Sequence, residues 1–243
     1  MQNKILFSGC SYSCGHPSIT KLVSDLFKKV DSETIAKSFA MPGHSNASIL
    51  KKIYDAINLE NFNNSVIFCQ LTHLHRVGCY HDITNCWIDH QPYFSNPIPA
   101  INESTGELNV EYEITYNKIL SQDDGMVVIF PDDKIRKEIK MAYETYLKYV
   151  FNQKEAFNDL MYKVDLITEY VKQKNCKIVF LFWPELKNKE QVDELKNRSF
   201  FNIDGNYSML DYSVKNKLIN NHDMHLSENG MIFISEKLYQ FAK

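Results

Sequence analysis

Short apolar runs alternate with segments of helical periodicity over the first part of the chain. Residues 4–8 and 65–71 are nearly continuous apolar runs of strand length, whereas residues 18–30 and 46–58 carry apolar side chains every three or four positions. Apolar runs without polar alternation are typical of parallel strands that helices cover on both faces. The alternation therefore predicts right-handed β-α-β units, from which doubly wound α/β folds are built.

The same alternation resumes near the end of the chain. A long segment of helical period covers residues 154–174, and an amphipathic helix with Ser227 as its N-cap closes the chain at residues 226–242. The pattern predicts a three-layer αβα sandwich around a mainly parallel, flavodoxin-like sheet. Five strands are expected, at residues 4–8, 34–40, 65–71, 177–183 and 207–212.

The middle of the chain departs from this pattern. Residues 78–151 are rich in Asn, Asp, Pro, Tyr and Gly and contain only short strand-like pieces before a helical stretch at 132–151. We interpret them as an insertion or lid within a single domain that spans residues 1–243. Its aromatic residues either line a binding site or pack the insertion onto the core. They are Tyr80, Trp87, Tyr93, Phe94, Tyr112 and Tyr116.

Composition narrows the class of protein. Of 243 residues, 44% are hydrophobic and 23% charged, which is typical of a globular fold with a substantial core. The net charge of −3 gives no reason to expect a nucleic-acid partner. No apolar run reaches the length of a membrane span, and the first strand begins too early for a secretion signal. We therefore expect a cytoplasmic protein whose six cysteines are reduced.

Two polar segments carry the candidate chemistry. Ser11 lies in a small-residue turn directly after the first predicted strand, at the sheet edge where open α/β folds bind ligands. Asp223 and His225 immediately precede the last predicted helix. A serine nucleophile needs a histidine base and a carboxylate that orients it, and these three residues supply that set. Ser13 as nucleophile and His222 as base are the alternatives.

Four segments, in this order, resemble the blocks of the SGNH (GDSL-like) hydrolase superfamily. Residues 9–13, Gly-Cys-Ser-Tyr-Ser, resemble the first block, Gly-Asp-Ser-x-Ser, with Cys10 where aspartate is usual. Residues 41–49 resemble the second block, and residues 223–225 the last, which is usually Asp-x-x-His. The third block, Gly-x-Asn-Asp, is replaced by Gln-Leu-Thr-His at residues 70–73.

The resemblance implies a serine-dependent ester hydrolase. Ser11 would be the nucleophile, with His225 as base and Asp223 as the carboxylate. Gly43 and Thr72 stand where the family has its oxyanion-hole residues. Thr72 replaces an asparagine there, and Asp223 is one residue closer to the histidine than the family's spacing.

A small acyl group is the expected target. The resemblance implies removal of a group such as O-acetyl from a carbohydrate or another small ester, without a cofactor, and Asn46 and Arg76 are expected to contact this substrate. Two alternatives stay open. The same site would serve an acyltransferase that acylates a sugar or lipid hydroxyl, and the altered blocks would also suit a non-catalytic binding protein.

A cluster of potential metal ligands offers a further hypothesis, a zinc site. Histidines and cysteines, both zinc ligands, are concentrated between residues 73 and 90. Their spacing matches no zinc motif, and no bound metal is expected. The residues are His73, His75, Cys79, His81, Cys86 and His90.

Overall fold

The computed structural model describes most of the chain. The described residues are 4–10, 18–40, 44–81, 86–90, 118–120, 127–129, 141–142, 145–198, 200–220 and 225–243. The chain divides into two compact units. The first combines Met1–His73 with Asn158–Lys243, and the second is Leu74–Phe157, close to the bounds of the predicted insertion.

A four-stranded parallel sheet forms the centre of the first unit. Its strands are β1 (Lys4–Ser8), β2 (Ile35–Ser38), β3 (Ser65–Leu71) and β8 (Lys177–Phe182). Their order is β2-β1-β3-β8, so the chain moves from β1 to one side and then crosses to the other. This is the strand order of a flavodoxin-like doubly wound fold, and it confirms the predicted α/β class.

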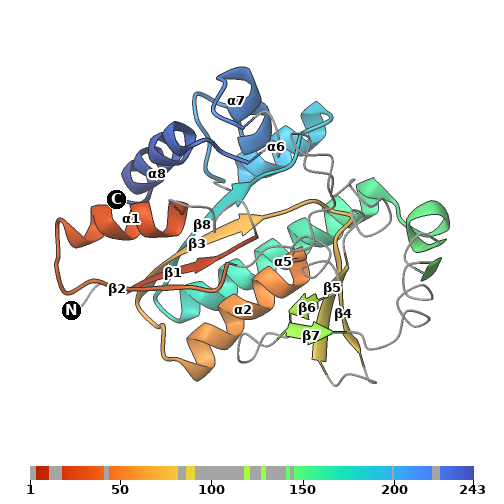
Figure 1. The fold of residues 1–243 in the computed structure, drawn as a ribbon, viewed down its shortest axis with the longest axis horizontal. Coiled ribbons are helices and arrows are strands. Elements are labelled where there is room, and N and C mark those ends of the chain that lie inside the picture. The colour runs from red at the N-terminus through yellow and green to blue at the C-terminus, as the bar shows by residue number, and fades with distance from the viewer. Residues whose placement is uncertain are drawn as a thin grey trace, which may run out of the picture. The chain divides into compact units, whose positions relative to one another are not determined.

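Helices cover both faces of this sheet. Figure 1 shows α1 (Ile19–Lys28) and α8 (Glu228–Ala242) on one side of the strands, and α2 (Asn46–Leu59) and α5 (Gln153–Gln173) on the other. Alternate side chains of β1 pack against the two helical layers. Ile5 and its neighbour Leu6 are both fully buried, although they face opposite sides of the sheet. Within the described residues, no helix combines the length and apolarity that crossing a bilayer requires.

Serine residues begin three of these helices. The Ser18 hydroxyl accepts the backbone N–H of Lys21 at 3.1 Å and starts α1. Ser45 starts α2, and Ser227 starts α8 by accepting the N–H of Gly230 at 3.2 Å. An N-cap serine satisfies an N–H that otherwise has no partner in the first turn, which is why these helices begin at those residues.

The predicted fifth strand at residues 207–212 is wrong. Only Ser208 pairs with the sheet, through a single parallel bridge to Phe182. The chain then enters α7 (Met209–Lys215), because the Ser208 hydroxyl accepts the N–H of Asp211 at 3.0 Å and caps the helix. A capping serine thus ends the strand after one residue, and the sheet has four strands in the described part of the chain. The remaining helix of this region is α6 (Lys189–Asn197).

The described part of the second unit contains two antiparallel strand pairs. β4 (Val77–His81) pairs with β5 (Cys86–His90), and β6 (Lys118–Leu120) pairs with β7 (Val127–Ile129). Helical turns occur within the stretch predicted at 132–151, at residues 141–142 and 145–149. Four of the aromatic residues proposed for the insertion lie outside the described residues. They are Tyr93, Phe94, Tyr112 and Tyr116.

Candidate functional site

The carboxyl end of β1 is tied to its neighbours by two side chains. Ser8, the last residue of β1, donates its hydroxyl to the carbonyl of Ile49 in α2 at 2.7 Å. Cys10 is fully buried, and its Sγ accepts the side-chain N–H of Gln70 at 3.2 Å. Ser11 follows Cys10 directly and lies outside the described residues. The residue before the candidate nucleophile is therefore fixed against the end of β3.

β3 extends further toward the carboxyl edge than β1, and the side chain of Asn46 bonds to the chain beyond the end of β1. The register of β1 with β3 ends at Ser8 opposite Cys69, three residues before Thr72. Asn46, the first residue of α2, contacts Thr72, which lies beyond the end of the β1 register. Its Oδ1 accepts the N–H of Thr72 at 2.7 Å, and its Nδ2 donates to the carbonyl of Thr72 at 3.0 Å. The side-chain amide of Asn46, expected to contact substrate, is thus engaged by the backbone of Thr72.

The hydroxyl of Thr72 is buried and has no hydrogen-bond partner among the described residues. Burying an unpaired hydroxyl destabilises a folded protein by roughly 1–3 kcal/mol. A donor of this kind, held at the carboxyl edge of the sheet, suits an oxyanion that forms only during a reaction.

Replacing Thr72 with valine tests this reading. We expect the free energy of unfolding to stay the same or rise by about 1 kcal/mol, because the variant removes an unpaired hydroxyl and keeps the branched shape. Turnover of p-nitrophenyl acetate is expected to fall about 100-fold, the usual cost of one oxyanion donor. Chemical denaturation and steady-state kinetics measure the two effects.

Thr34 offers a matched control for this substitution. Its hydroxyl is likewise buried without a partner among the described residues, but it precedes β2, at the amino edge of the sheet. Thr34→Val should change stability in the same direction and leave turnover unchanged. Equal losses of activity in the two valine variants would show that the Thr72 hydroxyl has no special role.

The orientation of α8 follows from a contact at its end. Lys177, the first residue of β8, donates from Nζ to the carbonyl of Ala242, the last residue of α8, at 2.7 Å. A helix of 15 residues is roughly 22 Å long and a strand of six roughly 20 Å. The helix therefore runs antiparallel to β8 and begins near the carboxyl edge of the sheet. Leu226, just before α8, shares a buried cluster with Trp183, just after β8.

His225 lies in the loop that leads into α8, as predicted. Its carbonyl accepts the N–H of Asn220 at 2.7 Å, and the next residue, Leu226, forms an antiparallel bridge with Ile219. These contacts pair the two ends of the loop. The Nδ1 atom of His225 is buried, and the residue is partly exposed. Asp223 and His222 fall in residues 221–224, outside the described residues.

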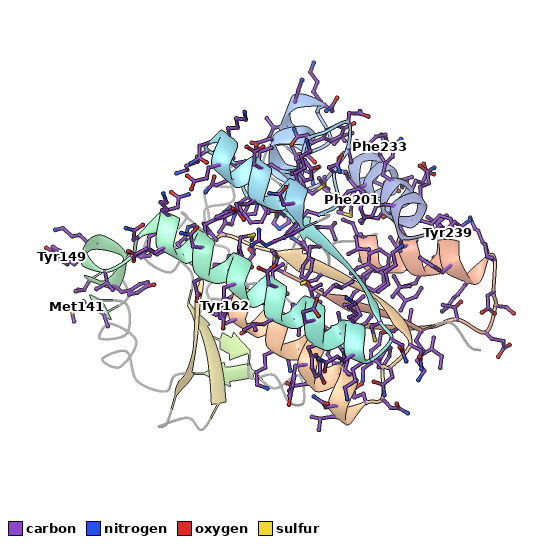
Figure 2. The ribbon with its side chains drawn as sticks, turned by 180° about the vertical axis from the view of Figure 1, so that it is seen from behind. Met141, Tyr149, Tyr162, Phe201, Phe233 and Tyr239 are labelled. Atoms are coloured by element: carbon purple, nitrogen blue, oxygen red, sulfur yellow. The ribbon has the colours of Figure 1, made fainter. Side chains whose placement is uncertain are left out.

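Aromatic contacts hold α8 in this position. Tyr239 of α8 packs edge-on against Phe27 of α1 with ring centroids 4.9 Å apart, and Phe201 packs against Phe241 of α8 at 5.4 Å. Phe233, near the start of α8, stacks on Tyr212 of α7 at 6.1 Å. Figure 2 labels Phe201, Phe233 and Tyr239, whose side chains lie along α8. The helix that follows His225 is thus fixed along its length.

Gly230, in the first turn of α8, is a structural residue that the motifs alone do not reveal. A Cβ atom at position 230 would lie 2.2 Å from the backbone oxygen of Leu218. The same oxygen accepts the N–H of Ser227 at 2.8 Å and its hydroxyl at 3.0 Å. The first turn of α8 therefore sits directly on the chain that precedes the His225 loop, and only glycine fits there.

The other predicted site residues are distributed as follows. Gly43 is one of residues 41–43, outside the described residues, and is followed by the buried His44 and Ser45. Arg76 is buried in the second unit. In the β-hairpin of that unit, the backbone register places His81 opposite Cys86. A search of the described residues finds no group of three metal-ligating side chains.

Three cysteines take part in no disulfide among the described residues: Cys10, Cys69 and Cys176. Burial strongly raises the pKa of the Cys69 thiol, so this cysteine stays protonated at neutral pH. A protonated, inaccessible thiol is a poor nucleophile. Cys69 is therefore not an alternative to Ser11 as the nucleophile.

Comparison with known proteins gave matches only among solved structures. No family model and no curated protein matches the sequence. A lipase/acylhydrolase from Enterococcus faecalis is 12% identical, with 99% of this chain and 94% of that chain covered, at a TM-score of 0.47. The psychrotrophic esterase EstA from Pseudoalteromonas sp. is 10% identical, with coverage of 98% and 96% and a TM-score of 0.48.

A third structure is similar over the same extent. The lipase Lip_vut3 from a goat rumen metagenome is 11% identical, with 99% of this chain and 97% of that chain covered, at a TM-score of 0.49. The similarity to each of these three structures extends over almost the whole of both chains.

Proposed function

We propose that this protein is a serine-dependent ester hydrolase of the SGNH type. The observation that carries the proposal is the direction of α8, which begins near the carboxyl edge of the sheet and is preceded by His225. Ser11 follows β1 in the sequence at the same edge, and β3 ends there at Leu71, directly before Thr72. A nucleophile, a base and a buried hydrogen-bond donor thus belong to three segments that meet one edge of the sheet.

The proposed reaction is a two-step acyl transfer. The Ser11 hydroxyl oxygen attacks the ester carbonyl while His225 takes its proton, and Asp223 orients and stabilises the imidazolium. The tetrahedral intermediate collapses to an acyl-serine and expels the alcohol, which receives the proton from His225. Water then attacks the acyl-serine, gives its proton to His225, and releases the carboxylic acid. The serine recovers its proton from His225.

The oxyanion of each tetrahedral intermediate needs hydrogen-bond donors. We assign this role to the hydroxyl of Thr72 and to backbone N–H groups near Ser11 and at Gly43. The substrate is a small ester, such as an O-acetyl group on a carbohydrate, as the resemblance of the sequence blocks implies. Preorganised donors in a buried site stabilise a developing negative charge more strongly than water does.

A fluorophosphonate probe tests the proposed function. The folded wild-type protein is expected to form one covalent adduct, which peptide mass analysis should locate at Ser11. The Ser11→Ala variant, with an unchanged unfolding transition, should form none. Ser13→Ala is the matched control and should still be labelled. A wild-type protein that forms no serine adduct would favour a non-catalytic binding protein and overturn both the hydrolase and the acyltransferase hypotheses.

A further inference from the structure

We propose that Asn46 is a positioning residue, which sets the place of the Thr72 hydroxyl in the oxyanion hole. This inference rests on the proposed function. The Asn46 side chain makes both of its described hydrogen bonds to the backbone of Thr72, at 2.7 Å and 3.0 Å. It acts on the chemistry only through the residue that it holds.

The geometry of the sheet explains why Thr72 needs such a partner. The carbonyl of Leu71 faces β8, where it accepts the N–H of Trp183 at 3.2 Å. Because successive residues of a strand direct their backbone groups to alternate sides, both groups of Thr72 face the β1 side. The β1 register, however, ends at Ser8. Among the described residues, Thr72 therefore has no strand partner at the point where its side chain is needed.

A side-chain amide is suited to fill this gap. It has one acceptor oxygen and an N–H donor, the same pair that a neighbouring strand would present. Asn46 is also held firmly, because it is the first residue of α2 and follows the fully buried N-cap Ser45. The hydroxyl of Ser45 accepts the N–H of Ser48 at 3.2 Å. The residue that makes both hydrogen bonds to Thr72 is thus fixed at the start of a capped helix.

Fixing the backbone of Thr72 also fixes its hydroxyl. Threonine is branched at Cβ, so few side-chain rotamers are available once the backbone is set. The threonine side chain is shorter than the asparagine that the SGNH block has at this position. A short side chain cannot compensate for an error in the position of its backbone. A misplacement of about 1 Å at a reacting centre can cost on the order of 100-fold in rate.

The Asn46→Asp variant tests the inference. Aspartate keeps the shape and the acceptor for the Thr72 N–H, but places a carboxylate oxygen against the Thr72 carbonyl, where the amide donated. We expect the maximal rate of fluorophosphonate adduct formation to fall about 10- to 100-fold. The probe concentration that gives half the maximal rate should change little, because Asn46 itself does not contact the probe.

Asn58→Asp is the matched control. Asn58 belongs to the same helix, and its Nδ2 donates to the carbonyl of Tyr54 at 3.1 Å in an exposed position. The labelling rate of this variant should equal that of the wild type. Should Asn46→Asp fail to fold, Asn46→Ala removes both hydrogen bonds without adding a charge and should lower the rate in the same direction.

A double-mutant cycle separates positioning from a general structural role. If Asn46 acts through the Thr72 hydroxyl, Asn46→Asp combined with Thr72→Val should be no slower than Thr72→Val alone. Losses that multiply in the double variant, or normal labelling of Asn46→Asp, would overturn the inference while leaving the proposed function intact. A wild-type protein that is not labelled would overturn the proposed function and this inference with it.

Discussion

Replacing His225 with alanine is expected to lower the turnover of p-nitrophenyl acetate by about 10⁴- to 10⁶-fold, the range found when the base of a serine hydrolase is removed. The loss arises because no other group takes the proton of Ser11. Stability should change little, because the side chain is partly exposed and the hydrogen bond to Asn220 uses the His225 backbone. Steady-state kinetics and thermal unfolding measure the two quantities.

His222→Ala is the informative comparison for this variant. His222 stands where the SGNH block that the sequence resembles has its acid, and it is the alternative base. The His222→Ala variant should retain most of the wild-type activity if His225 is the base. A larger loss in His222→Ala than in His225→Ala would reverse the assignment, and equal activity in all three proteins would remove histidine from the mechanism.

Replacing Gly230 with alanine is expected to destabilise the protein by about 3 kcal/mol, which corresponds to a fall of roughly 10 °C in Tm for a chain of this size. In an exposed helix the same change stabilises by up to about 1 kcal/mol, because glycine is a poor helix former. Here the added methyl group would lie 2.2 Å from the backbone oxygen of Leu218, which cannot move without breaking its bonds to Ser227. Differential scanning calorimetry gives the change in Tm.

Asn229→Ala is the control for Gly230→Ala. Asn229 is the exposed neighbour in the first turn of α8, and its replacement should leave Tm within a few degrees of the wild type. Activity should fall with Gly230→Ala even below its Tm, since displacement of this turn also moves the His225 loop. A Tm equal to that of the wild type would mean that the turn adjusts and that the close approach is not required.

Sequence patterns predicted most of the first unit because the physics of these elements is local. The β3 run is apolar throughout, and the observed bounds, Ser65–Leu71, are the predicted ones. Helices begin at Ser18, Ser45 and Ser227, where a hydroxyl accepts an N–H three residues later. These signals need only neighbouring residues, and they do not depend on the rest of the fold.

The failures are contacts between distant segments. Residues 207–212 were predicted as a strand, yet Ser208 caps a helix after a single bridge to Phe182, and sequence alone does not say which tendency prevails. The contact of the Asn46 amide with the backbone of Thr72 was not predicted either, because it depends on where β1 ends, and the substrate contact of Asn46 stays a prediction. No local pattern reveals where one strand stops relative to its neighbour.

The contact between Lys177 and Ala242 bears on how the protein can be handled. It places the end of α8 at the amino edge of the sheet, the edge at which β1 also begins with Lys4. The candidate site belongs to the other edge. A tag, fluorophore or surface linker joined after Lys243 would therefore be attached at the edge remote from the candidate site, so an immobilised protein should keep that edge accessible to solvent.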